Sequence, residues 1–141
     1  MVDGEEQLKE SIDDVSARWG KGFEINLVDH WKPVIQNWKK KKGIIIHLTM
    51  YGSDLHSSLK KIKLSSQDIL VVVGGEKIPR EIFDISDFNI SVGNQPHSEI
   101  AALAVFLDRL FKGEELKHLF HDEKLRIVPC SEGKKVRVIG Q

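Results

Sequence analysis

Two short runs of consecutive apolar residues constrain the fold of this chain more than any other feature. They are "IIIHL", residues 44–48, and "ILVVV", residues 69–73. Both are rich in β-branched side chains, and apart from one histidine neither contains a polar residue, so each predicts a strand that is buried on both faces. Strands of this kind are typical of a parallel sheet covered by helices on both sides. We therefore expect an α/β fold.

The segments around these runs predict an alternation of helices and strands. An apolar stripe at three- and four-residue steps predicts a helix over residues 5–19, with Leu8, Ile12, Val15 and Trp19 on one face. The other helices are expected at "HWKPVIQNWKK" (30–40), with Trp31, Ile35 and Trp38 on one face, at "DLHSSLKKI" (54–62), capped by Ser53, and from Ser98 to Phe111. The other strands are expected at "FEINLV" (23–28), "FNISV" (88–92), "KLRIVP" (124–129) and "KKVRVIG" (134–140), the last two joined by the turn "CSEGK". This order indicates a mostly parallel sheet with helices on both faces.

Composition is that of one globular domain. The chain has 141 residues, of which 40% are hydrophobic and 30% charged, so a packed core is expected. No apolar run approaches the roughly 20 residues that span a bilayer, and the acidic start lacks the apolar core of a signal peptide. Cys130 is the only cysteine, which excludes an intrachain disulfide and fits a reducing cytoplasm. The net charge of zero gives no evidence for nucleic-acid binding.

Three glycine-containing loops are expected at the same edge of the sheet. They are "HLTMYGSD" (47–54), "VVVGGEKIPRE" (71–81) and "VGNQPHSE" (92–99), and each leaves the carboxyl end of a predicted strand. Ligands of open parallel sheets bind outside these ends, and glycine lets the backbone approach a ligand closely. For any one loop a simple turn is an equally good interpretation, but three loops together favour a binding site. The standard dinucleotide and triphosphate signatures are absent.

The loop at residues 92–99 holds more polar groups than a turn requires. Ser98 is a favourable helix cap, and Glu99 lies in the first helical turn, where negative charge is stabilising. Three other residues have no such structural role, and their amide and imidazole groups suit a polar ligand: Asn94, Gln95 and His97.

The remaining reactive residues have simpler interpretations. His118 and His121 have a possible metal-ligand spacing, but a solvated surface is the favoured reading, and no metal site is predicted. His47, on an apolar strand, is expected to be a satisfied core histidine rather than a catalyst. Cys130 has no basic or histidine neighbour that would make it a nucleophile. The lysine run at 39–42 is usually a solvated face, and a phosphate-contacting patch is the alternative.

At the three loops the sequence closely resembles the archaeal tRNA cytidine-56 2′-O-methyltransferases, a branch of the SPOUT methyltransferase superfamily. The matching segments are "HLTMYG", "VVVGGEKIPREI" and "VGNQPHSEIAALAVFLDRL", and the similarity runs from near residue 8 to the end. The resemblance implies a single SPOUT-type domain over residues 1–141, with a trefoil knot in its C-terminal half. It also implies a cytoplasmic homodimer that uses S-adenosylmethionine to methylate a cytidine ribose in tRNA.

The resemblance further implies which residues contact the cofactor. Residues 92–99 would form one wall of the cofactor pocket, with backbone groups reading the adenine. The small residues Ala101, Ala102 and Ala104 would allow close helix packing at a dimer interface. Carried over by motif, the cofactor contacts are Leu48, Gly74, Gly75, Glu76, Lys77, Ile78, Val92, Gly93, Asn94, Gln95, Pro96, His97, Ser98 and Glu99.

The catalytic group is left open. Methyl transfer requires the ribose oxygen, the methyl group and the sulfur in line, together with removal of a proton, and needs no metal. Family members carry an additional strand and helix before the region matching residue 8, with a His-Arg pair whose arginine is the implied catalytic group. That arginine has no matching position here, so we expect a domain that lacks its first strand and helix, either because its start is misassigned or truncated or because the element has been lost. Such a chain is expected to bind the cofactor and to methylate tRNA poorly or not at all. Arg80 is a local candidate for RNA phosphate or proton handling, and an ion pair with Glu81 or Asp84 is the alternative.

Two other functions remain as alternatives to an active methyltransferase. One is a non-catalytic remnant of the family that binds the cofactor or RNA. The other is an unrelated small-molecule α/β enzyme, which is disfavoured because no nucleophile, metal set or dinucleotide fingerprint is present.

Overall fold

The chain divides into two compact units. The structure, a computed structural model, describes the backbone of residues 2–62, 67–74 and 78–139, with side chains from Glu5 onward. One unit consists of residues 30–117, and the other of residues 1–29 together with 118–141. The expectation that residues 1–141 form a single SPOUT domain stays a prediction.

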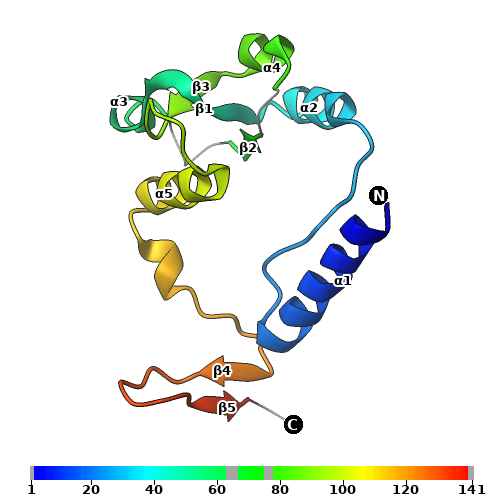
Figure 1. Ribbon diagram of the computed structural model, residues 1–141, viewed down its shortest axis with the longest axis vertical. Coiled ribbons are helices and arrows are strands. Elements are labelled where there is room, and N and C mark those ends of the chain that lie inside the picture. Colours follow the sequence, from blue (N-terminus) through cyan, green and yellow to red (C-terminus); the bar gives the residue numbers. More distant parts are fainter. Residues whose placement is uncertain (1, 63–66, 75–77, 140–141) are drawn as a thin grey trace. The chain divides into compact units, whose positions relative to one another are not determined.

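The unit formed by residues 30–117 is built around a parallel sheet. Its strands are β1 (Ile44–Asp54), β2 (Ile69–Val73) and β3 (Phe88–Ser91), in the order β2-β1-β3 (Figure 1). Its helices are α2 (Trp31–Lys40), α3 (Leu55–Leu59), α4 (Arg80–Ile85) and α5 (Glu99–Phe111), followed by the short 3₁₀ helix η1 (Glu114–Lys117). The longest strand therefore lies in the centre, paired in parallel with both neighbours.

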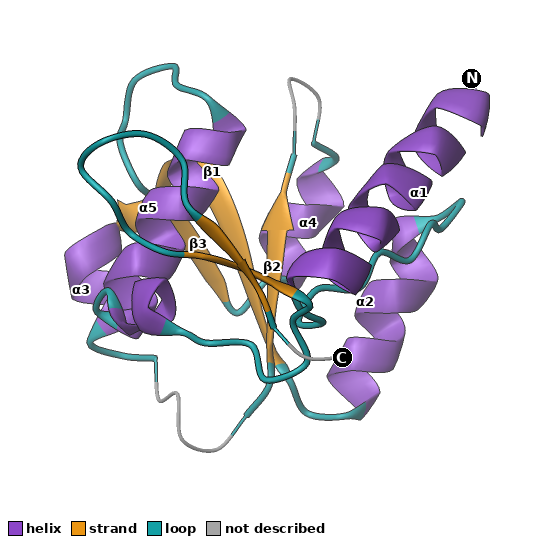
Figure 2. Ribbon diagram, turned by 90° about the horizontal axis from the view of Figure 1, so that it is seen from below, coloured by secondary structure: helices purple, strands orange, loops and turns teal. Residues whose placement is uncertain are grey.

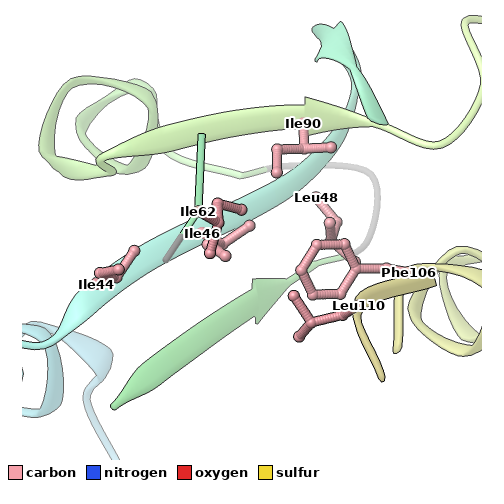
Figure 3. Packing of buried hydrophobic residues seen from close by; sticks show 7 residues of the cluster. All are labelled: Ile44, Ile46, Leu48, Ile62, Ile90, Phe106 and Leu110. Carbon is pink, nitrogen blue, oxygen red and sulfur yellow. The ribbon is translucent and has the colours of Figure 1, made fainter. Parts of the chain in front are cut away.

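Alternate side chains of β1 face opposite layers of helices. Ile44, Ile46 and Leu48 belong to one buried cluster with Phe106 and Leu110 of α5 (Figure 3). Leu55 and Leu59 of α3 pack against the same cluster. This is the larger of the two cores, and Ile46 and Phe106 in it are completely buried. Figure 2 shows α3 and α5 on one side of the sheet, and α2 and α4 on the other.

The second core lies between the sheet and helices α2 and α4. Ile45 is fully buried there against Ile35 of α2 and Ile82 of α4. Trp31 and Trp38 flank Ile35, which confirms the apolar face predicted for this helix. The predicted α/β architecture, with a parallel sheet and helices on both faces, is thus confirmed for this unit.

Strand β1 continues beyond the predicted apolar run, which corrects the expectation of a loop at residues 47–54. Its pairing with β3 shifts register, because Leu48 and Ser53 both lie opposite Ile90. The intervening residues 49–52 form a bulge that carries their side chains away from the regular pleat. Since Ser53 pairs in the strand, the helix cap is Asp54 instead, whose carboxylate accepts a hydrogen bond from the Ser57 amide at 2.9 Å.

Glycine is required at one position of this bulge. A Cβ atom on Gly52 would lie 2.5–2.7 Å from backbone atoms of Ile90 and Asn89. Backbone atoms of a paired strand cannot give way as a side-chain tip can. Gly52 therefore allows β1 to return to β3 after the bulge.

The unit formed by residues 1–29 and 118–141 contains α1 (Val2–Trp19) and the strands β4 (Leu125–Ile127) and β5 (Val136–Val138). The two strands pair antiparallel, which confirms the predicted terminal hairpin, with shorter strands than expected. The Lys124 amide donates to the Arg18 carbonyl at 3.0 Å and so ties the hairpin to the end of α1.

Two expectations for this unit were incomplete or wrong. "FEINLV" does not form a strand: its alternating pattern meets no pairing strand in the described part of the chain, and Phe23 and Val28 are exposed. In α1, Leu8 and Val15 of the predicted apolar stripe are also exposed. Across the residues that the structure describes, no helix combines the length and apolar character needed to cross a membrane.

Candidate functional site

A cavity of about 490 Å³ opens at the carboxyl ends of β1 and β2. Its walls come from β1 and the bulge, from the segments that follow β2, from α4 and from the start of α5. The parallel sheet brings these segments to one edge, as the sequence predicted. Six of the sequence-predicted cofactor residues line the cavity: Leu48, Gly74, Ile78, Pro96, His97 and Glu99.

The other predicted cofactor residues fall into two groups. Gly75, Glu76 and Lys77 lie outside the described residues. The rest belong to the same loop but are not placed among the lining residues: Val92, Gly93, Asn94, Gln95 and Ser98.

Polar side chains of this loop hold its own conformation. The Asn94 amide donates to the Met50 carbonyl at 2.7 Å and joins the loop to the β1 bulge. His97 Nε2 lies 3.2 Å from the Gly93 carbonyl, which can only accept, so Nε2 is the donor of this contact, and in the neutral imidazole Nδ1 is then the acceptor. The Ser98 hydroxyl caps α5 through the Ala101 amide, as predicted. The interpretation that Asn94 and His97 have no structural role was therefore wrong.

His47 lines the cavity, although the sequence predicted only a core histidine at this position. It is completely buried, and its Nδ1 lies 2.8 Å from Oδ1 of Asn89 on β3. The Asn89 amide nitrogen donates to the Phe83 carbonyl at 3.0 Å, which fixes Oδ1 as the atom facing the histidine. His47 Nε2, by contrast, is buried without a hydrogen-bond partner among the described residues. The core histidine is therefore satisfied at only one of its two nitrogens.

Burial governs the charge of His47. Loss of hydration lowers the pKa of the imidazole, and this effect outweighs the opposing effect of the Asn89 hydrogen bond. The ring is therefore neutral at physiological pH. The signal in the sequence was that His47 is the single polar residue in an otherwise apolar run.

Further cavity residues were not named as site candidates. Thr49, Met50 and Tyr51 come from the bulge, within the segment 47–54 that was expected to border a site, and Phe83 comes from α4, a helix that was not predicted. Tyr51 is 79% exposed, so it lies at the rim. These residues combine aromatic and polar surfaces, which suits a ligand with a flat ring and hydroxyl groups.

Arg80 is not part of the cavity wall. It is exposed at the start of α4, and Glu81, its proposed ion-pair partner, instead pairs with Lys32 at 2.7 Å. Among the described residues, no ion pair joins Arg80 to Glu81 or Asp84. Arg80 is thus an exposed cation beside the cavity-forming segment, and the alternative interpretation as an ion pair with either residue was wrong.

A second cavity lies at the opposite, amino end of the sheet. Its volume is about 660 Å³, and it is lined by lysines from two separate segments: Lys39 in the last turn of α2 and Lys42 just after it, and Lys61 after α3. Asp87 also contributes to its wall, and its carboxylate accepts a hydrogen bond from the Ile45 amide at 2.8 Å. We call Lys39, Lys42 and Lys61 the basic rim.

The parallel sheet with a cavity at its carboxyl edge defines an α/β domain of the ligand-binding type. Residues 19–137 match the family described as tRNA ribose 2′-O-methyltransferase, aTrm56. The chain is 53% identical over 135 residues to the tRNA (cytidine(56)-2′-O)-methyltransferase of Thermococcus kodakarensis, covering 94% of this chain and 74% of that protein. It is 48% identical over 134 residues to the protein of the same name from Methanocaldococcus jannaschii, again covering 94% and 74%. The chain therefore belongs to the tRNA ribose 2′-O-methyltransferase family.

Proposed function

We propose that this protein transfers a methyl group from S-adenosylmethionine to the ribose 2′-hydroxyl of cytidine 56 in tRNA. The observation that carries the proposal is the agreement between family membership and the cavity. Six residues carried over as cofactor contacts come from strand β1, from the segment after β2 and from the segment leading into α5, and they line one cavity at the carboxyl edge of the sheet. We further propose that the reaction takes place in the cytoplasm and that the C-terminal half forms the knot of the superfamily.

The chemistry required of the chain is alignment and proton removal. When bound, S-adenosylmethionine supplies a methyl group that is already activated by its sulfonium. The residues of the cavity must then hold the ribose hydroxyl in line with it and accept its proton. His97 lines the cavity, and because its Nε2 proton is directed to the Gly93 carbonyl, Nδ1 of the neutral imidazole is left as an acceptor. His97 is thus a better-placed proton acceptor than Arg80, whose exposed cation suits a tRNA phosphate.

We propose that two copies of the chain pair through helix α5. Phe106 and Leu110 of this helix are buried against the sheet, whereas Ile100 is 82% exposed. Ala101 and Ala104 are exposed as well, and side chains this small permit close approach of a second helix. A second copy that brings the same helix would cover this apolar face symmetrically.

Methyl transfer to defined tRNAs tests the proposed function. Labelled S-adenosylmethionine is incubated with an unmodified tRNA transcript, and the product is hydrolysed in alkali, which does not cleave beside a 2′-O-methylated ribose. We expect one protected linkage, at cytidine 56. A transcript with 2′-deoxycytidine at that position is the control and should accept no methyl group. Equal labelling of both transcripts, or labelling at another nucleotide, would contradict the proposal.

A further inference from the structure

One polar atom at the cavity has no role in the fold. His47 Nε2 is buried without a hydrogen-bond partner among the described residues, although the same ring is firmly held at its other nitrogen. Leaving a buried acceptor unpaired costs about 1–3 kcal/mol, so such atoms in native structures call for an explanation. His47 also lines the cavity. The missing partner can therefore come from a molecule bound there.

The hydrogen bonds around the ring determine what kind of partner Nε2 can accept. The Asn89 amide nitrogen donates to the Phe83 carbonyl, so Asn89 presents its oxygen to the histidine. An oxygen acceptor requires a proton on Nδ1, and in the neutral imidazole Nε2 then bears a lone pair. Nε2 is thus an acceptor, and its partner must be an N–H or O–H group.

We propose that His47 Nε2 is a hydrogen-bond-accepting subsite of the cavity, which receives an N–H or O–H group of the bound methyl donor. The inference rests on the proposed function, because it takes the ligand of the cavity to be S-adenosylmethionine. The donor group is its adenine amino group, a ribose hydroxyl or its α-ammonium group. Asn89 and the Phe83 carbonyl act as positioning groups that fix the tautomer of the ring.

Access to the subsite involves a local side-chain movement. Nε2 is covered by neighbouring atoms, and the ring of Phe83 lies edge-on to the imidazole with centroids 4.6 Å apart. Phe83 is itself part of the cavity wall. A change of its rotamer on ligand binding uncovers the imidazole edge, and rotamer changes of this size are common at binding sites.

Two substitutions separate the two ends of the ring. In His47→Asn, the amide nitrogen takes the place of Nδ1 and still donates to Asn89, but no acceptor reaches the cavity. In His47→Gln, the longer side chain places an amide oxygen near the position of Nε2. Binding of S-adenosylhomocysteine is measured by calorimetry for both variants and the unmodified chain. We expect about tenfold weaker binding for His47→Asn, and a change within about threefold for His47→Gln.

Ligand analogues identify the donor group and separate failure of the subsite from failure of the proposed function. The series lacks, in turn, the adenine amino group, each ribose hydroxyl and the amino-acid portion. The analogue without the donating group should bind His47→Asn and the unmodified chain with equal affinity. If the His47→Asn effect persists with every analogue, or if His47→Gln loses as much affinity as His47→Asn, the subsite is wrong. If the unmodified chain does not bind S-adenosylhomocysteine, the proposed function fails instead.

Nitrogen NMR of the unmodified chain gives a readout that requires no variant to fold. In protein labelled with ¹⁵N-histidine, His47 is expected to show a protonated Nδ1 and an unprotonated Nε2. Addition of S-adenosylhomocysteine should move the Nε2 resonance upfield, as acceptance of a hydrogen bond requires, and leave Nδ1 nearly unchanged. A saturating ligand that leaves the Nε2 resonance in place would overturn the proposal.

Discussion

His47 is a single residue that should make the stability of the fold depend on pH. Burial lowers the pKa of its imidazole below the ordinary histidine value of about 6.5 that applies to the unfolded chain. Between these two pKa values the unfolded chain binds more protons than the folded one, so the free energy of unfolding decreases as the pH falls below about 6.5. Above that pH, His47 does not make the free energy of unfolding depend on pH.

Urea unfolding at a series of pH values checks this prediction. The unmodified chain should lose stability between pH 7.5 and pH 5.5. The control, His47→Asn, has no titrating group at this position and should show a shallower decline over the same range. Identical slopes for the two proteins would mean that His47 titrates alike in the folded and unfolded chains.

Replacing Gly52 or Gly93 by alanine adds the same methyl group in two different surroundings. The two variants therefore distinguish an effect on packing from an effect on ligand binding. A Cβ at Gly52 would meet the backbone of β3 at 2.5–2.7 Å, whereas a Cβ at Gly93 would lie 3.6 Å from His97, an ordinary contact. We expect Gly52→Ala to lower the free energy of unfolding by about 1–3 kcal/mol, as overpacking does. Gly93→Ala should leave the stability unchanged within about 0.5 kcal/mol.

Thermal and urea unfolding of the two variants test this difference. Equal stabilities would show that the bulge adapts to a methyl group. The neutral variant has a further use, because weaker binding of S-adenosylhomocysteine by a stable Gly93→Ala protein would place the ligand against Gly93.

At the scale of the helix, α5 is the element through which we expect two copies of the chain to associate. Ile100 is 82% exposed and does not take part in the core, so Ile100→Glu should leave the fold intact and place a charge in the proposed interface. Light scattering at micromolar protein should report a dimer for the unmodified chain and a monomer for this variant. Val138→Glu, the same change at a 71% exposed position of β5, is the control and should remain dimeric. A monomeric unmodified chain would contradict the proposed pairing.

Elements were predictable where a local pattern determined their burial. The continuous apolar run at 69–73 is the observed β2, and the apolar helix with its Ser98 cap is the observed α5. The expected strand "FEINLV" has a similar local signal, but a strand needs hydrogen-bonding neighbours, which no local pattern specifies. The extension of β1 was missed for the complementary reason, since its outer half is held by pairing with β3 and not by apolar residues.

The candidate site was predictable to the extent that topology determines it. Parallel strands bring their carboxyl ends to one edge, so loops far apart in the sequence can be grouped from the predicted strands alone. The resemblance then selected residues within those loops. The sequence could not predict that only one ring nitrogen of His47 has a hydrogen-bond partner among the described residues. That arrangement depends on Asn89 of β3 and Phe83 of α4, and no sequence spacing relates these residues to residue 47.

For the molecule as a whole, the basic rim is a local concentration of positive charge in a chain whose net charge is zero. The sequence contains 21 basic and 21 acidic residues, yet Lys39, Lys42 and Lys61 line one cavity together. We expect these lysines to contact tRNA phosphates. Changing all three to glutamine should weaken tRNA binding and reduce the slope of log K against log salt by roughly 0.7–0.9 for each phosphate contact that is lost.

The control for this experiment removes the same charge elsewhere. Lys9, which is partly exposed, and the exposed Lys32 and Lys117 form ion pairs with Asp13, Glu81 and Glu114. Their triple replacement by glutamine changes the net charge equally and should affect the salt slope much less. Binding measured by filter retention over a salt series distinguishes the two variants. If the two triple variants show the same salt dependence of tRNA binding, only the total charge matters and the basic rim does not contact tRNA specifically.

The register shift in β1 divides the strand into two regions that should differ in the rate of amide hydrogen exchange. Residues 44–48 are buried and paired with β2, and residues 46–48 are paired with β3 as well, so their amide protons can exchange with solvent only when the sheet itself opens. Beyond Leu48 the strand loses its pairing with β2 and passes through the bulge, where amides can exchange by local fluctuation. Deuterium uptake should therefore be slow through Leu48 and fast at residues 49–52 of the bulge, with the boundary at the wall of the cavity. The segment that lines the cavity can then change its conformation while the strand that anchors it remains closed.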